Sequence, residues 1–334
     1  MSWKERRLIT ILSTILLILV IALILVLALR YREHRAEPDP DQTPTMGTVT
    51  DQTAFNSLSY DNGSATLSFE RDEAGVWHWT ADRDLPLDDS VLQDILAQLT
   101  VWAPQQTLTD SAALESSGLD EPAGSLTAAT EDGTYTTLLF GKTTTGGASR
   151  YVRLNGDEST AYIVDDSLFT LMQTPVYDMC RLPDLPVLES SRIQCVTISG
   201  PEQEGGALVT TLLPQHADGS AATSWRADGA NVTDDPQVKA LLEDLAALAF
   251  SKCVDYAPSE EAASICGLDA PAAVLRVDYV TESGAEQTLE LTIGNRVPDK
   301  SGRYVRLADG DAIYLLTTDL LDPLMRVASS GLDG

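Results

Sequence analysis

Basic residues and histidines are scarce in this chain. Its 334 residues include 22 Lys and Arg against 50 Asp and Glu, which gives a formal net charge of −28. Residues 1–35 carry a net charge of +4, so the rest of the chain carries −32. A body this acidic is repelled by nucleic acids and anionic lipid, and no nucleic-acid partner is expected.

The motifs of common metal and cofactor sites are also lacking. The three histidines, His34, His78 and His216, have no metal-ligand spacing. No G-x-S-x-G, P-loop or G-x-G-x-x-G motif occurs, and TTTGGASR at 143–150 indicates a loop between strands. We therefore expect no metal, no cofactor and no catalytic residue.

Only four cysteines are present: Cys180, Cys195, Cys253 and Cys266. None forms the C-x-x-C motif of zinc or thioredoxin-like sites. A disulfide between Cys253 and Cys266 is one interpretation, because they flank a short predicted helix and an exported domain permits disulfides. Free, partly buried thiols are the interpretation that we favour.

Acidic residues are densest in DRDLPLDD at 82–89. This run lacks the residue order of an EF-hand loop, so a solvated turn that leads into a helix cap is favoured over a calcium site. Pairs of carboxylates also serve glycoside hydrolysis, but among 50 acidic residues chance proximity is expected. The acidic residues therefore indicate no particular chemistry.

The longest apolar run extends from Leu8 to Leu29 and contains no charged residue. As a helix it would be about 33 Å long, enough to cross a bilayer core of about 30 Å. Signal-peptide cores are shorter and end at an A-x-A-like site, whereas this run ends in ALRYREHR. We predict an uncleaved transmembrane anchor, with a cleaved signal peptide or a buried helix as alternatives.

The flanking charges predict the orientation of this anchor. Three basic residues lie on each side, but moving Lys4, Arg6 and Arg7 outward would oppose the membrane potential, at about 2.3 kcal/mol per charge per 100 mV. We expect residues 1–7 to be a cytoplasmic tail, 8–29 the anchor and 30–53 a stalk rich in proline and acidic residues. The body then lies on the extracytoplasmic side of the cell membrane.

The body repeats one pattern twice. GLDEP at 118–122 and GLDAP at 267–271 are 149 residues apart, and the same predicted elements surround each. Two strands and a tryptophan strand precede a long helix, 88–102 or 235–250, and a short helix, 111–117 or 259–266. Strand-like runs close each copy: 125–133, 134–142, 149–156 and 160–172, then 273–284, 286–295, 302–310 and 311–325.

Short turns between successive strands indicate antiparallel pairing. We predict two similar α+β domains, at 54–180 and 190–328, each a mostly antiparallel sheet with one long and one short helix against one face. A single transmembrane helix precedes them. Asp88 and Asp235 are the expected N-caps of the long helices, and Pro236 suits a first helical position.

Each pentapeptide is predicted to stop the short helix before it. A glycine in the left-handed conformation ends the helix, the following leucine packs back on it, and the proline prevents its resumption. A ligand site at the two aspartates is the alternative. The motif residues are Gly118, Leu119, Asp120 and Pro122 in the first copy, and Gly267, Leu268, Asp269 and Pro271 in the second.

In this order, the features resemble the bacterial family known as domain of unknown function 4340. Besides the pentapeptides, the matching residues are Trp79, Gly141, Tyr151, Val152 and Tyr162, and then Trp225, Gly294, Tyr304, Val305 and Tyr314. The resemblance covers nearly all of the chain beyond the stalk. It implies an N-terminal anchor, an extracytoplasmic repeat and an association with ABC-type export systems, and it brings no catalytic residue.

A tyrosine and an arginine recur on one strand of each copy, in SRYVRL and GRYVRL. Strand alternation places Tyr151 with Arg153, and Tyr304 with Arg306, on one face of the sheet. A packed tyrosine with a solvated arginine is the simpler interpretation, but both residue types are common interface anchors. They are the candidate partner surface.

We therefore predict a single-pass membrane protein with an extracytoplasmic body that acts by interaction and without turnover. Its partners would be proteins of a membrane complex, and the resemblance favours an accessory role in an ABC-type transport or envelope assembly. The alternatives are an envelope module that binds a glycan, peptide or cation, and an envelope hydrolase.

Overall fold

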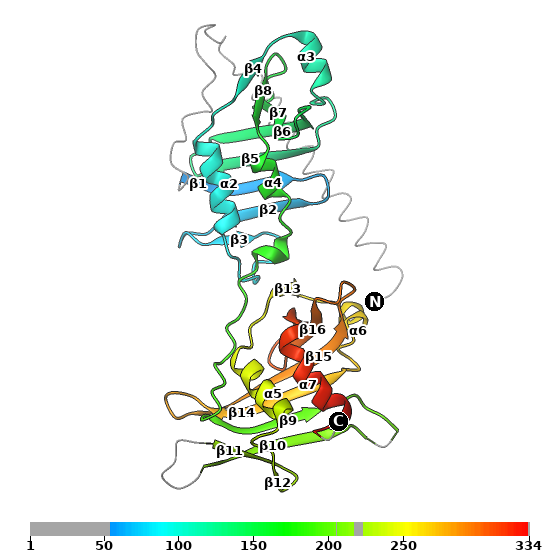
Figure 1. Cartoon of the computed structure of the whole chain (residues 1–334). Helices are drawn as coiled ribbons and strands as arrows, with labels where there is room; N and C mark the ends of the chain where they lie inside the picture. Colours follow the sequence, from blue (N-terminus) through cyan, green and yellow to red (C-terminus); the bar gives the residue numbers. More distant parts are fainter. Residues whose placement is uncertain (1–53, 205, 217–222, 333–334) are drawn as a thin grey trace, which may run out of the picture. The chain divides into compact units, whose positions relative to one another are not determined.

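The computed structural model describes residues 54–204, 206–216 and 223–332, which form two antiparallel sheets with few helices (Figure 1). The predicted tail, anchor and stalk, residues 1–53, lie outside the described residues. Within the described ranges, no helix has the length and apolar character needed to cross a membrane.

The first sheet has the strand order β3-β2-β1-β5-β6-β7-β8-β4. All of its pairings are antiparallel. The strands are β1 (Phe55–Asp61), β2 (Thr66–Arg71), β3 (Trp77–Trp79), β4 (Gln106–Leu108), β5 (Gly124–Thr130), β6 (Tyr135–Thr143), β7 (Ser149–Leu154) and β8 (Ala161–Asp165).

The second sheet repeats this order as β11-β10-β9-β14-β15-β16-β17-β13 and adds β12 beside β11. Its strands are β9 (Ile193–Ser199), β10 (Val209–His216), β11 (Thr223–Ala227), β12 (Ala230–Asn231), β13 (Lys252–Asp255), β14 (Ala273–Val280), β15 (Glu286–Arg296), β16 (Gly302–Leu307) and β17 (Ile313–Thr317). The prediction of two similar antiparallel sheets is confirmed.

Helices α2 and α4 cover one face of the first sheet, and α5 and α7 cover one face of the second (Figure 1). The helices of the first copy are α2 (Ser90–Thr100), α3 (Ser111–Ser116), α4 (Ser167–Met172) and the 3-10 helix η2 (Val176–Met179). The helices of the second copy are α5 (Pro236–Ala246), α6 (Glu260–Ile265) and α7 (Thr318–Ser330).

Periodicity in the sequence builds the core of each half. In α2 the buried residues Leu92, Ile95, Leu96 and Leu99 follow the spacing of a single helical stripe. In β5, and in β6 as far as Phe140, every second residue is buried. Burial of each large aliphatic side chain contributes about 1.5–3 kcal/mol, so the two patterns together hold helix to sheet.

Two predicted strand runs were wrong in their second halves. Residues 160–172 divide into β8 and α4, and residues 311–325 divide into β17 and the start of α7. Each run joins two short apolar stretches across polar residues, at 165–167 in the first copy and 317–319 in the second, and short apolar stretches do not by themselves distinguish a strand from a helix. Among the described residues each copy therefore has one more α-helix than predicted, the first also has the 3-10 helix η2, and the edge strands β4 and β13 were not predicted at all.

The N-cap prediction was right for one long helix and wrong for the other. Asp235 caps α5 and accepts hydrogen bonds from Gln237 N and Val238 N, with Pro236 in the first turn. The N-cap of α2 is Asp89, which makes no side-chain cap bond. Asp88 instead lies one residue before it and accepts from Ser90 N at 3.0 Å.

The short helices were predicted on the same face as the long ones, and the packing differs from this. Cys266 and Leu268, at the end of α6, form a buried cluster with Ile313, and Tyr304 packs against it. Ile313 alternates with Tyr314, which stacks on Phe250 just after α5. The end of α6 therefore packs on the opposite face, which we call the outer face.

Candidate interaction surface

The pentapeptide attaches the short helix to the sheet. Gly118 and Gly267 both have φ of 73°, in the left-handed region that glycine tolerates. Leu119 and Leu268 are buried directly after them. Leu268 N donates to Ala263 O at 3.0 Å, which closes the last turn of α6.

A second glycine in each copy completes this attachment. The carbonyl of Ser117 accepts from Lys142 N at 2.8 Å, and that of Cys266 accepts from Asn295 N at 2.7 Å. A Cβ on Gly141 or on Gly294 would collide with the same carbonyl oxygen. The glycine at the end of the apolar run in β6 and β15 is therefore required by the helix end that docks there.

The remaining motif residues lie at the surface. Asp120 and Asp269 are exposed, as is Pro122, and Pro271 is partly exposed. Their position follows from the turn that leads from the helix end back to the next strand.

The two Tyr/Arg pairs lie on the outer faces, as their alternation predicts. Tyr151 and Arg153 are partly exposed while Val152 between them is fully buried, and Val305 is likewise buried between Tyr304 and Arg306. Tyr151 pairs with Ile163 on β8, and Arg153 pairs with Leu139 on β6. The first pair thus has partly exposed apolar residues beside it.

The two Tyr/Arg pairs differ in the contacts that their side chains make. Burial against the cluster at the end of α6 raises the pKa of Tyr304. The Nε of Arg153 is buried, and among the described residues it has no hydrogen-bond partner. A guanidinium donor without an acceptor is unusual, because most buried polar atoms are paired.

The outer face of the first sheet is lined with hydroxyl groups beyond Arg153. Ser59 bonds to Ser68 at 2.8 Å, and Thr127 bonds to Thr137 at 3.3 Å, across neighbouring strands. All four residues are partly exposed. These residues offer neutral donors and acceptors on the same face as the guanidinium of Arg153.

A different arginine of the same strand was missed in the sequence. Arg150 is buried, and its Nε lies 2.5 Å from Asp166 Oδ1 at the start of α4. Its Nη1 donates to Gly141 O at 2.7 Å, and its guanidinium carbon lies 3.8 Å above the Phe169 ring. Alternation with Val152 could have located it on the buried face.

Arg303 has the corresponding place in the second sheet. Its Nη1 donates to Gly294 O at 2.9 Å, as Arg150 does to Gly141 O. Burial lowers the pKa of Arg303. The two arginines thus brace the two glycines that receive the helix ends, which makes them structural residues.

Other sequence candidates have local structural partners. His78 Nε2 lies 3.0 Å from Asp72 Oδ2. His34 and the side chain of His216 lie outside the part of the chain that the structure describes. In the 82–89 run, the hydrogen bond from Ser90 N lowers the pKa of Asp88. Within the described ranges, no group of three His, Cys, Asp or Glu could hold a metal.

A family model described as a domain of unknown function (DUF4340) matches residues 77–211 and 225–328. The chain belongs to the DUF4340 family. Each matched segment contains one pentapeptide, so the family is present as two tandem copies. No curated protein and no solved structure matches the chain.

The DUF4340 matches are offset from the two sheets. The first begins at β3 and ends within β10, so β1 and β2 precede it. Both nevertheless contain the helix-ending glycine, the receiving glycine and the bracing arginine described above. These residues are what the two DUF4340 copies share in three dimensions.

Proposed function

We propose that the protein is a membrane-anchored, extracytoplasmic interaction protein that acts without turnover, as an accessory component of an ABC-type transport or envelope assembly. We propose further that the outer face of the first sheet, around Tyr151 and Arg153, contacts the partner protein.

The observation that carries this proposal is the unpaired Nε of Arg153. A buried donor without an acceptor costs about 1–3 kcal/mol, and more when the group is charged. Docking of a partner on this face would remove the cost if the guanidinium turned outward to a carboxylate or carbonyl oxygen, because the Nε itself is shielded from solvent. Tyr151, one pleat away on the same face, supplies aromatic contact area of the kind enriched in interfaces.

The hydroxyl rows beside Arg153 support the same proposal. Thr127 and Thr137 are neutral and partly exposed, so a partner can cover them without burying an unpaired charge. The whole body is strongly acidic. A cationic, aromatic spot on such a body therefore favours a partner that presents acidic or carbonyl groups at that point.

The proposed location and assembly rest on other features. The uncharged run from Leu8 to Leu29 supports an anchor, and the basic tail before it supports an extracytoplasmic body. The association with ABC-type systems comes from the family resemblance. Membership in a family of unknown function is compatible with this role and does not assign it.

The test is recovery of partners from detergent-solubilised membranes with the tagged full-length chain as bait. Wild type should recover transporter subunits. Arg153→Met keeps the length of the side chain and removes its donors, and it should reduce recovery by about 30-fold, as expected for an interface anchor worth about 2 kcal/mol. Arg306→Met, at the matched position of the second copy, should leave recovery unchanged.

Several outcomes would contradict the proposal. Wild type recovered alone would remove the interaction role, and full recovery with Arg153→Met would remove this surface. Circular dichroism and thermal melting of both variants control for loss of fold. Specific retention of a glycan, peptide or cation, or hydrolytic turnover, would support the alternative functions instead.

A further inference from the structure

The segment between the two sheets contains the 3-10 helix η2, which is tied to the first copy. Arg181 N donates to Pro86 O at 2.6 Å, and Asp88 N donates to Met179 O at 2.7 Å. Cys180 itself forms an antiparallel bridge with Leu87. The end of η2 is therefore fixed on the loop that precedes α2.

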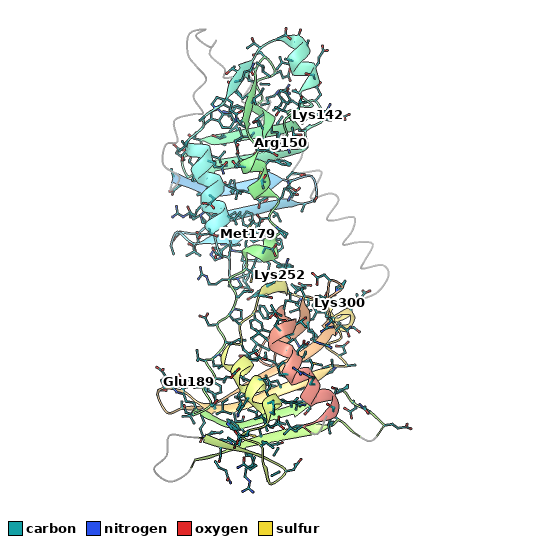
Figure 2. All side chains as sticks on the ribbon, viewed as in Figure 1. Lys142, Arg150, Met179, Glu189, Lys252 and Lys300 are labelled. Carbon is teal, nitrogen blue, oxygen red and sulfur yellow. The ribbon has the colours of Figure 1, made fainter. Side chains whose placement is uncertain are left out.

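The same short helix is tied to β13 of the second copy. Tyr177 Oη donates to Asp255 Oδ1 at 3.0 Å, and Lys252 Nζ lies 2.6 Å from Asp178 Oδ1. Figure 2 shows Met179 and Lys252 on these adjoining segments. Two bonds of different chemistry thus fix the register of η2 against β13.

This register brings two cysteines together. Cys180 directly follows η2, and Cys253 lies within β13 between the two residues that hold η2. Cys180 is 7% exposed and Cys253 is 0% exposed, and both are free thiols. The two thiols lie close enough for each to shift the pKa of the other.

We propose that Cys180 and Cys253 form a disulfide that covalently joins the two copies. A low-molecular-weight disulfide or a thiol–disulfide oxidoreductase is the oxidant. The Cys180 thiolate attacks that disulfide and releases one thiol, and the Cys253 thiolate then attacks the Cys180 sulfur and releases the second. Two protein thiols lose two protons and two electrons, and one external disulfide is reduced to two thiols.

The surroundings of the two thiols set the order and speed of these steps. Burial raises the pKa of both, that of Cys253 to about 12, and the neighbouring Cys253 thiol partly offsets the rise for Cys180. Cys180 is therefore the first attacking group. Formation in the folded chain should be slow, because both sulfurs are shielded from the oxidant until the segment opens.

The chemical test uses the purified full-length chain in detergent. The chain is incubated with oxidised glutathione, with and without a low urea concentration that promotes local opening. Remaining thiols are alkylated under denaturing conditions, and peptides are identified by mass spectrometry. We expect a Cys180–Cys253 cross-link, while Cys195 and Cys266 stay alkylated, and a melting temperature several degrees above that of the reduced chain.

Variants separate this pairing from others. Cys180→Ser and Cys253→Ser should each abolish the cross-link and the rise in melting temperature, and Cys195→Ser should retain both. If Cys180 and Cys253 were still alkylated after incubation with oxidised glutathione, both with and without urea, the proposal would be overturned. A Cys253–Cys266 cross-link would overturn it as well, because it would show that Cys253 faces the other thiol.

Occurrence of this disulfide in cells rests on the proposed extracytoplasmic location. A second arm therefore alkylates intact cells with a membrane-permeant reagent before extraction. A cross-link that forms in the purified chain but is missing in cells would contradict the location and leave the pairing intact. A cross-link in both arms supports the pairing and the location together.

Discussion

The two copies use the same positions of the same sheet with different chemistry. On the outer face, Thr127 and Thr137 lie opposite each other on β5 and β6, and a hydrogen bond of 3.3 Å joins their hydroxyl groups. The matched positions of β14 and β15 are Arg276 and Glu290, whose charged groups lie 3.6 Å apart. One face is thus neutral where the other forms a row of ions.

The buried side of the two sheets differs in the same way. Arg150 and Arg303 both donate to the carbonyl of the receiving glycine, but only Arg150 has a carboxylate beside it, that of Asp166. Asp166 lies four residues after Tyr162, and Thr318 lies four residues after the matching Tyr314. The second copy therefore has a hydroxyl where the first has an ion-pair partner.

The comparison separates what the fold requires from what each copy is free to change. The glycines, the helix ends and the arginine-to-carbonyl bonds are present in both copies. The charges around them are not. On the second outer face Arg276 lies beside the carboxylates of Asp278 and Glu290, whereas on the first a guanidinium donor of Arg153 has no partner among the described residues. This asymmetry is why we propose the partner surface on the first copy.

The largest expected effect comes from the buried ion pair. Asp166→Ala leaves the buried guanidinium of Arg150 without its carboxylate and should destabilise the first sheet by about 3–5 kcal/mol. Thr318→Ala, at the matched position, removes one bond to Lys300 O and should cost about 1 kcal/mol. Hydrogen exchange of the full-length chain, resolved by peptide, measures each sheet separately.

The double variant Asp166→Ala/Arg150→Met controls for the buried charge. It leaves no unpaired ion, so it should recover part of the protection that Asp166→Ala loses. Equal losses for Asp166→Ala and Thr318→Ala would show that the carboxylate is unimportant, and the contrast between the copies would then be wrong.

A smaller and equal effect is expected at the receiving glycines. Gly141→Ala and Gly294→Ala each place a methyl group against a backbone carbonyl, which should cost about 1–3 kcal/mol in the sheet concerned. Gly146→Ala and Gly310→Ala are matched controls, because a Cβ at either position meets nothing within 4 Å. A large effect in only one copy would contradict a shared docking device.

Much of this fold could be predicted from the sequence, for identifiable reasons. Alternation along β5 to β7 and the stripe of α2 are strong local signals, and the two GLDxP motifs made the repetition visible. The edge strands β4 and β13 could not be predicted, because each is four residues or fewer and is defined by its pairing with β8 or β17.

The candidate surface could be predicted only in part. The repeated SRYVRL and GRYVRL runs located Tyr151 and Arg153 on the outer face. The sequence could not show that Arg153 Nε lacks an acceptor or that Arg150 has Asp166, since both depend on contacts between distant elements. The proximity of Cys180 and Cys253 could not be predicted for the same reason, because the two residues are far apart in the sequence.

The smallest expected effect is a pH dependence confined to the charged row of the second copy. Hydrogen bonds from Thr288 and Arg276, together with the charge of Arg276, lower the pKa of Asp278 in the folded chain. The Asp278 carboxylate therefore binds a proton more readily in the unfolded chain than in the folded chain. Its contribution to the free energy of unfolding is complete above about pH 4 and is lost as the pH falls through the pKa of Asp278 in the folded chain. Ala129 takes the matched place in the first copy, where no such group titrates.

Hydrogen exchange of β14 and β15 between pH 6 and pH 3, corrected for intrinsic rates, measures this contribution. The free energy of the opening that permits exchange should fall by less than about 1 kcal/mol over this range, because Arg276 is exposed to solvent. Asp278→Asn should remove the part of this pH-dependent fall that comes from Asp278. Comparison of wild type with this variant isolates Asp278, since Asp132 and other carboxyls with lowered pKa are present in both proteins. An identical pH dependence in the two proteins would mean that the ion row adds no stability, and the second outer face would then differ from the first in charge alone.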